Sequence, residues 1–87
     1  MQFVVLKNST TCIGPFKTEE DAKTFINTDA ANEKAEYEVR SDLIPAPYID
    51  EEWCSFYGVT ELTLTICDRF MVETRKTVWK VTELVEP

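Results

Sequence analysis

The chain has 87 residues, of which 44% are hydrophobic and 11% aromatic, and its 16 acidic and nine basic side chains give a formal net charge of −7. This length suits one domain with one modest core, and the apolar content excludes a disordered chain. The negative charge excludes direct nucleic-acid binding through a basic footprint and disfavours an anionic membrane surface. A protein partner with a basic surface, including a nucleic-acid-binding host protein, suits the charge better.

The chain contains three cysteines and no histidine. Cys12, Cys54 and Cys67 are odd in number and widely spaced, which does not fit a disulfide framework. Zinc sites need cysteine and histidine at short spacings, so we expect no metal site and no cofactor. We recognise no secretory signal and no membrane-spanning run in the sequence, and we therefore expect a cytoplasmic protein.

The first two predicted elements are short strands. Residues 2–8 form a short β-rich run in which residues 3–6 are all apolar, which is typical of a buried strand. Residues 12–16 are predicted to pair with it. Because Pro15 cannot donate a hydrogen bond to a ladder, the second strand must stop there or lie at a sheet edge.

A helix is predicted to begin after Thr18 and to end between residues 27 and 32. Thr18 precedes Asp21 by three residues, which is the spacing of a capping box. Glu19 and Glu20 complete an acidic first turn, which the helix dipole favours.

The same helix carries an apolar stripe. Ala22, Phe25 and Ile26 are spaced i, i+3, i+4, so they share one face that should pack on the core. Phe16 lies just before the cap and can fold back onto this stripe.

The middle of the chain predicts a strand and then a second helix. Residues 36–44 alternate apolar and polar side chains, which indicates a half-exposed strand. Residues 49–58 predict the helix, with Asp50 as N-cap and Gly58 as the residue after its last turn. The apolar residues at helical spacing in this segment are Ile49, Trp53, Phe56 and Tyr57.

The last third of the chain predicts strands. Residues 61–67 alternate strictly, which indicates one buried face and one wet face. This strand either runs on to about residue 73 or ends in a tight turn at 68–69. Residues 74–76 are predicted to turn the chain, and residues 77–85 to form the last strand.

Together these elements predict a single α+β domain over residues 1–87. Its antiparallel sheet has four to five strands, and two short helices pack on one face. The predicted buried set is Val4, Leu6, Phe25, Ile26, Val39, Leu62, Leu64, Ile66 and Val81.

Residues typical of an active site are sparse in this sequence. The single glycine at Gly14, followed by Pro15 and by acids, indicates a corner between strand and helix and not a phosphate cradle. Cys54 and Ser55 have no histidine to act as base, so we expect no enzyme. A carboxylate pair that acts as acid and base stays open, because sequence alone does not exclude it.

The acidic charge is concentrated in one stretch. Residues 19–52 hold 11 of the 16 acids and three of the nine bases, a local charge of −8. This stretch is either a solvated face or a docking face for a basic partner, and protein docking is favoured over imitation of nucleic-acid phosphates.

Large aromatic rings lie among these acids. The helical spacing of Trp53 and Phe56 favours the core, whereas Tyr48, beside two prolines, is the ring that we expect to be exposed. The candidate binding residues are Glu19, Glu20, Asp21, Tyr48, Asp50, Glu51, Glu52 and Trp53.

The first half of the chain resembles a pattern found in small bacteriophage proteins. In that pattern a Gly-Pro-Phe corner, here Gly14, Pro15 and Phe16, leads into an acid-capped helix with an Ala-x-x-Phe stripe, here Ala22 and Phe25. The resemblance implies a phage accessory protein that acts in the host cytoplasm. Such proteins bind and inhibit or modulate a host or defence protein.

Three functions therefore remain as hypotheses. The first is a non-catalytic protein that binds and inhibits or modulates a protein target. The second is a small enzyme or small-molecule-binding module that uses carboxylates. The third is a structural subunit of a larger particle. The sequence does not indicate the oligomeric state.

Overall fold

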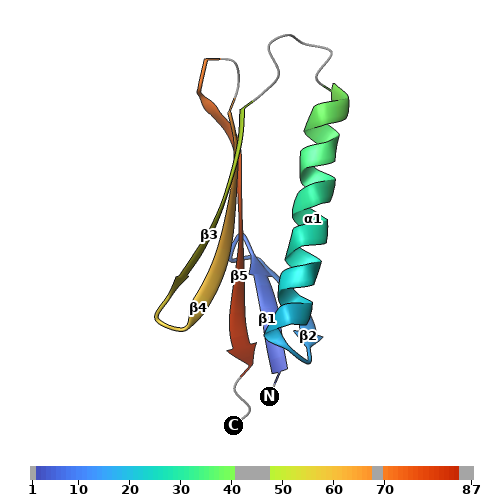
Figure 1. Ribbon diagram of the computed structural model, residues 1–87, viewed down its shortest axis with the longest axis vertical. Helices are drawn as coiled ribbons and strands as arrows, with labels where there is room; N and C mark the ends of the chain where they lie inside the picture. Colours follow the sequence, from blue (N-terminus) through green and yellow to red (C-terminus); the bar gives the residue numbers. More distant parts are fainter. Residues whose placement is uncertain (1, 41–47, 68–69, 85–87) are drawn as a thin grey trace.

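The structure, a computed structural model, describes residues 2–40, 48–67 and 70–84. One helix packs on one face of a five-stranded antiparallel sheet, whose strand order is β2-β1-β5-β4-β3 (Figure 1). The molecule is elongated, with extents of 51 × 23 × 20 Å. The elements are β1 (Gln2–Lys7), β2 (Thr11–Phe16), α1 (Glu19–Arg40), β3 (Tyr48–Phe56), β4 (Val59–Cys67) and β5 (Glu73–Leu84).

The start of α1 is as the sequence predicts. The hydroxyl of Thr18 accepts a hydrogen bond from the Asp21 amide at 3.1 Å, so Thr18 is the N-cap. Ala22 and Ile26 are buried. The rings of Phe16 and Phe25 pack with centroids 5.6 Å apart, which confirms that Phe16 folds back onto the helix.

The helix continues well beyond its predicted end. It spans 22 residues to Arg40, and the strand predicted for residues 36–44 is therefore wrong over residues 36–40. Residues 41–44 lie outside the described residues. Alanine, glutamate and lysine dominate residues 30–36, and these are strong helix formers. The short alternation after residue 36 does not outweigh that propensity in a helix that is already nucleated.

The second predicted helix is a strand. β3 pairs in register with β4 along its whole length, from Tyr48 opposite Cys67 to Phe56 opposite Val59. Tyr57 and Gly58 both have positive φ, 50° and 75°, and form the two-residue turn of a hairpin. Gly58 thus ends a strand and not a helix. The sheet therefore carries one helix, and the prediction of two short helices is wrong.

The β4–β5 hairpin corrects two further boundaries. β4 ends at Cys67, which pairs with Glu73 at the start of β5, so the first strand does not run on to residue 73. Residues 74–76 are part of β5 and not a turn. The alternative turn at residues 68–69 lies outside the described residues.

β2 lies at the sheet edge, as Pro15 requires. The β1–β2 register is irregular opposite Gly14 and Pro15, between the pairs that Phe3 and Val5 make. Gly14 has a φ of 131°, and a Cβ there would lie 3.2 Å from the carbonyl oxygen of Phe3. This position therefore strongly favours glycine.

The core lies between α1 and the sheet. In β4 the buried residues are Leu62, Leu64 and Ile66, as predicted, and Val81 of β5 is buried too. Phe25 is only partly buried against this core, and the side chain of Val39 lies outside the described ones. The buried residues are Val5, Ala22, Ile26, Ala30, Leu62, Leu64, Ile66, Cys67, Trp79 and Val81, together with the polar Glu33 and Thr77.

In β1 the predicted face is wrong. Val5 is fully buried, whereas Val4 and Leu6 are only partly buried on the opposite face. Val5 pairs with Val81 on the side that α1 covers. Because residues 3–6 are all apolar, the sequence contains no alternation that could indicate which residues face the helix.

Candidate functional site

The predicted binding residues separate into two acidic groups. The helix-start acids are Glu19, Glu20 and Asp21 in the first turn of α1. The acidic edge is Asp50, Glu51 and Glu52 in β3.

Contacts between α1 and the sheet show how far apart the two groups lie. Glu19 accepts a hydrogen bond from Thr60 at 2.9 Å, at the start of β4. Lys34 contacts Glu51 at 2.6 Å. Glu19 and Lys34 are 15 residues apart on one helix, which is about 22 Å at 1.5 Å per residue. The acidic stretch therefore does not form one continuous docking face.

The acidic edge lies on the outermost strand of the sheet. Within the described part of the chain β3 pairs only with β4, and eight of its nine residues are exposed. In a hairpin with a two-residue turn, the pair next to the turn is hydrogen-bonded, and hydrogen-bonded pairs then alternate along the strands. The amides and carbonyls of Ile49, Glu51, Trp53 and Ser55 therefore point away from β4, along the open edge.

The acids of β3 lie on both faces of the sheet. Glu51 pairs with the buried Leu64, so its side chain is on the helix face, where Lys34 compensates its charge. Asp50 and Glu52 pair with Thr65 and Thr63, which places both on the face that α1 leaves uncovered. Among the described residues neither of these two acids forms an ion pair.

The aromatic rings of this region are outside the core. Trp53 is 39% exposed, Phe56 is 56% exposed, and Tyr48 is 51% exposed. The prediction that Trp53 and Phe56 are core residues is wrong, because they lie on an edge strand that α1 does not cover. Tyr48 is exposed as expected, but Tyr57, at 98%, is the ring most open to solvent.

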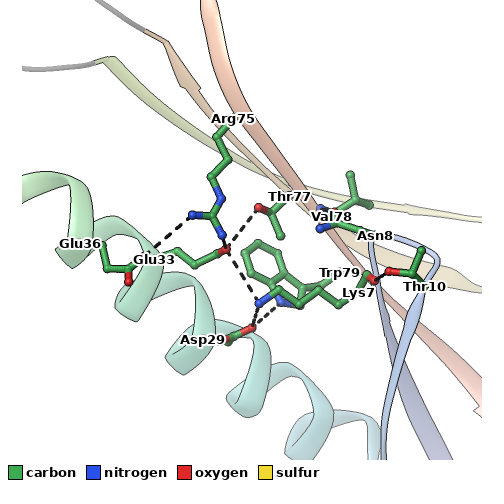
Figure 2. Close-up of polar contacts among 10 residues, drawn as sticks. All are labelled: Lys7, Asn8, Thr10, Asp29, Glu33, Glu36, Arg75, Thr77, Val78 and Trp79. Carbon is green, nitrogen blue, oxygen red and sulfur yellow. Dashed lines mark hydrogen bonds and ion pairs between the residues drawn. The ribbon is translucent and has the colours of Figure 1, made fainter.

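A second group of charged residues connects α1 to the sheet. We call Lys7, Asp29, Glu33 and Arg75 the helix–sheet charge cluster (Figure 2). The Nζ of Lys7 lies 2.8 Å from Asp29 Oδ2 and 3.9 Å from Glu33 Oε1, and Arg75 donates to Glu33 Oε1. Three segments far apart in sequence, β1, α1 and β5, thus supply the cluster.

Two uncharged donors complete this cluster. Trp79 donates from Nε1 to Asp29 Oδ2 at 2.9 Å, and Thr77 donates to Glu33 Oε1 at 3.4 Å. Lys7 also lies over the Trp79 ring, with its Nζ 5.5 Å from the centroid. Glu33 is buried, and its Oε2 has no hydrogen-bond partner among the described residues. Only Glu33 of the cluster is buried, and its charge and that of Asp29 are compensated by Lys7 and Arg75 from the sheet, which indicates a role in docking the helix.

The pKa of Asp29 is lowered. Burial by itself would raise it, but the hydrogen bonds from Lys7 and Trp79, with the positive charges of Lys7 and Arg75, outweigh burial. The unfolded chain therefore binds a proton at a higher pH than the folded chain does. The charged carboxylate stabilises the fold above about pH 4, and this contribution is lost as the pH falls through the lower folded pKa.

We expect Asp29→Asn to remove the contribution of this carboxylate to the pH dependence of stability. At pH 7 the variant should be about 1–2 kcal/mol less stable, because it loses charge-assisted hydrogen bonds. The difference from the natural protein should shrink as the pH is lowered from 5 towards 2. Urea unfolding at a series of pH values measures it. A difference that stays constant across this range would show that the charge of Asp29 does not stabilise the fold.

Nothing in the sequence predictions points to this cluster. Residues 77–85 are predicted as a strand with no face assigned to Trp79, although the alternation of Thr77, Trp79 and Val81 indicates one. Asp29 and Glu33 lie one turn apart on the helix, but their basic partners Lys7 and Arg75 are distant in the chain. Such pairing becomes visible only when the strands are adjacent.

Comparison with protein-family models, with curated proteins and with solved structures finds no match. Within residues 2–40, 48–67 and 70–84, no three histidine, cysteine or acidic side chains are grouped closely enough to hold a metal ion. In the same residues, no helix combines the length and the apolar character needed to cross a membrane.

Proposed function

We propose that this protein is a non-catalytic binding protein that inhibits or modulates a protein target with a basic surface. The observation that carries the proposal is β3, an exposed edge strand with Asp50 and Glu52 on one face, Trp53 on the other, and exposed rings at Tyr48 and Phe56. Trp and Tyr are frequent anchors at interfaces, and unpaired acids attract a partner of opposite charge. A phage accessory protein of the host-takeover or anti-defence type is the context that the sequence resemblance suggests.

The two acidic groups differ in what they offer to a partner. Part of the helix-start group is engaged within the molecule, since Glu19 accepts a hydrogen bond from Thr60 and the Nζ of Lys23 lies 3.9 Å from Glu19 and 4.0 Å from Glu20. The acids also complement the dipole of α1 in its first turn. Within the part of the chain that the structure describes, Asp50 and Glu52 form no ion pair and neither lies in a helix, and Glu52 accepts a hydrogen bond only from the Cys54 thiol, at 3.9 Å. This contrast favours the acidic edge as the docking surface.

The test is an affinity capture from a lysate of the host cell with three forms of the protein. Asp50→Lys with Glu52→Lys should abolish retention of basic proteins that the natural form binds at low salt. Glu20→Lys with Asp21→Lys changes the net charge equally and is the matched control, so it should keep most of the retention. Retention should also weaken between 0.1 and 1 M salt, because the Debye length falls from about 10 to about 3 Å.

Three outcomes would contradict the proposal. Capture that is unchanged by salt and by both double variants would show that the acids only keep the protein soluble. Equal losses in the two double variants would show that net charge, and not β3, controls retention. Loss only in the control variant would assign docking to the helix-start acids. Thermal unfolding of all three forms is measured alongside, because an unfolded variant would lose retention for another reason.

A further inference from the structure

We propose that the partner is held as an added strand: an extended segment with basic residues at alternate positions pairs antiparallel with the open edge of β3. This inference rests on the proposed function and specifies the partner's form. The observation that carries it is the backbone of β3. Every second residue from Ile49 to Ser55, four in all, points its amide and carbonyl away from β4, and these groups are unpaired among the described residues. An open edge of this kind is a template for another strand.

The two edges of the sheet are not equivalent. At β2 the edge contains Pro15, which lacks an amide, and an irregular register opposite Gly14. Both features discourage further pairing. β3 has nine residues in continuous register with β4 and no proline. The open edge of β3 is therefore the one that can accept a strand.

The side chains of β3 decide which strand fits. The backbone amides and carbonyls of Asp50 and Glu52 are hydrogen-bonded to β4. Opposite an added strand, these two residues therefore occupy non-hydrogen-bonded positions. Cross-strand Cα atoms are closest at such positions, about 4.5 Å apart, and opposite charges there are favourable. The matching residues of the partner are basic and two apart. Beside them, on the helix face, apolar residues meet Ile49 and Trp53, and the residue between the two basic ones faces Glu51, whose charge Lys34 compensates.

A second copy of this chain fits the same edge poorly. If two β3 strands paired antiparallel about Glu51, Asp50 of one copy would face Glu52 of the other. If they paired about Trp53, the two Glu52 side chains would be diagonal neighbours. Like charges at such positions are destabilising. The charge pattern therefore favours a basic segment over self-association.

The first test uses synthetic peptides of about ten residues, long enough to cover the strand, with lysine alternating with valine or threonine. N-methylation at the apolar positions blocks the amides that face β3 and should weaken binding roughly tenfold or more. N-methylation at the lysine positions blocks the opposite edge and should change binding less than about threefold. A peptide of the same composition with all lysines at one end should bind about tenfold more weakly.

Amide hydrogen exchange tests which amides of β3 pair with β4 and which pair with the added peptide. In the free protein the amides of Asp50, Glu52 and Cys54 should be protected, while those of Glu51 and Trp53 exchange quickly. The alternating-lysine peptide should protect the second set and leave the first unchanged. This pattern would be absent with Asp50→Lys and Glu52→Lys, whose β3–β4 ladder stays protected if the fold is intact.

The outcomes separate this inference from the proposed function. Peptide binding that is indifferent to the order of residues and to the methylated edge, with no new protection in β3, overturns the added strand. If lysate capture still depends on Asp50 and Glu52 in that case, the binding function stands without it. Protection of both amide sets in the free protein, with a dimer in sedimentation, would assign the edge to a second copy and also overturn the inference.

Discussion

Trp79→Ala should destabilise the fold more than any other single change considered for this protein. Trp79 is fully buried and is the largest side chain in the core. Truncation of a buried tryptophan costs about 3–5 kcal/mol, a large part of the 5–15 kcal/mol that typically separates folded from unfolded states. The variant also loses the hydrogen bond that Trp79 donates to Asp29, and it loses the ring that lies beneath the Lys7 ammonium. We expect this variant to have the lowest unfolding temperature and the lowest urea midpoint of all the variants named.

Trp53→Ala is the matched control for this prediction. It removes the same side chain from β3, where 39% of the residue is exposed, so the loss should be below about 2 kcal/mol. Trp79→Phe should fall between the two, because it keeps an aromatic ring and loses only the hydrogen bond and some volume. Equal destabilisation by the alanine variants at 53 and 79 would contradict the placement of the two rings.

Arg75→Met should destabilise the fold more than the simultaneous replacement of Arg75 and Glu33 by methionine. With Arg75 removed, Glu33 remains buried, and its polar neighbours among the described side chains are the more distant Lys7 and Thr77. An uncompensated buried charge costs about 3–5 kcal/mol, and the lower end is expected here because the Arg75 side chain is 40% exposed. Methionine at both positions removes the charge along with its partner, so the double variant should lie within about 1–2 kcal/mol of the natural protein.

Urea unfolding at pH 7 measures all members of this cycle, including Glu33→Met alone. The decisive quantity is the coupling between the two positions, which should be larger than 1 kcal/mol because the groups are in contact. Additive effects would show that Glu33 is compensated without Arg75. Glu36→Gln is a suitable surface control, since Glu36 lies 3.9 Å from Arg75 at an exposed position and should change stability little.

The features that depend on interactions within a short segment are the ones that the sequence predicts correctly. The N-cap at Thr18, the stripe of Ala22 and Ile26, and the buried face of Leu62 and Leu64 each depend on interactions within a few residues. Capping and strict alternation act over one turn or one strand, so a single segment contains all the information that they need.

The segment from residue 48 to 58 shows the limit of local patterns. Its apolar spacing suits a helix, yet it forms β3 because β4, of equal length, follows the turn at Tyr57 and Gly58. A ladder of nine pairs outweighs the weak propensity of one short segment. The exposure of Trp53 follows from that pairing, as does the open edge of the proposed docking strand. Neither could be deduced from residues 48–56 alone.

The sequence by itself determined the α+β class, the acidic character, the cap of α1 and the buried face of β4. Only the tertiary structure decided that α1 is the one helix in the described residues, that Val5 and not Val4 faces it, and that the acids divide into two groups. It also paired Asp29 and Glu33 with Lys7 and Arg75 across more than 20 residues of chain. The physical reason is that charge pairing, strand order and exposure depend on which segments become neighbours, and that depends on the packing of the whole chain.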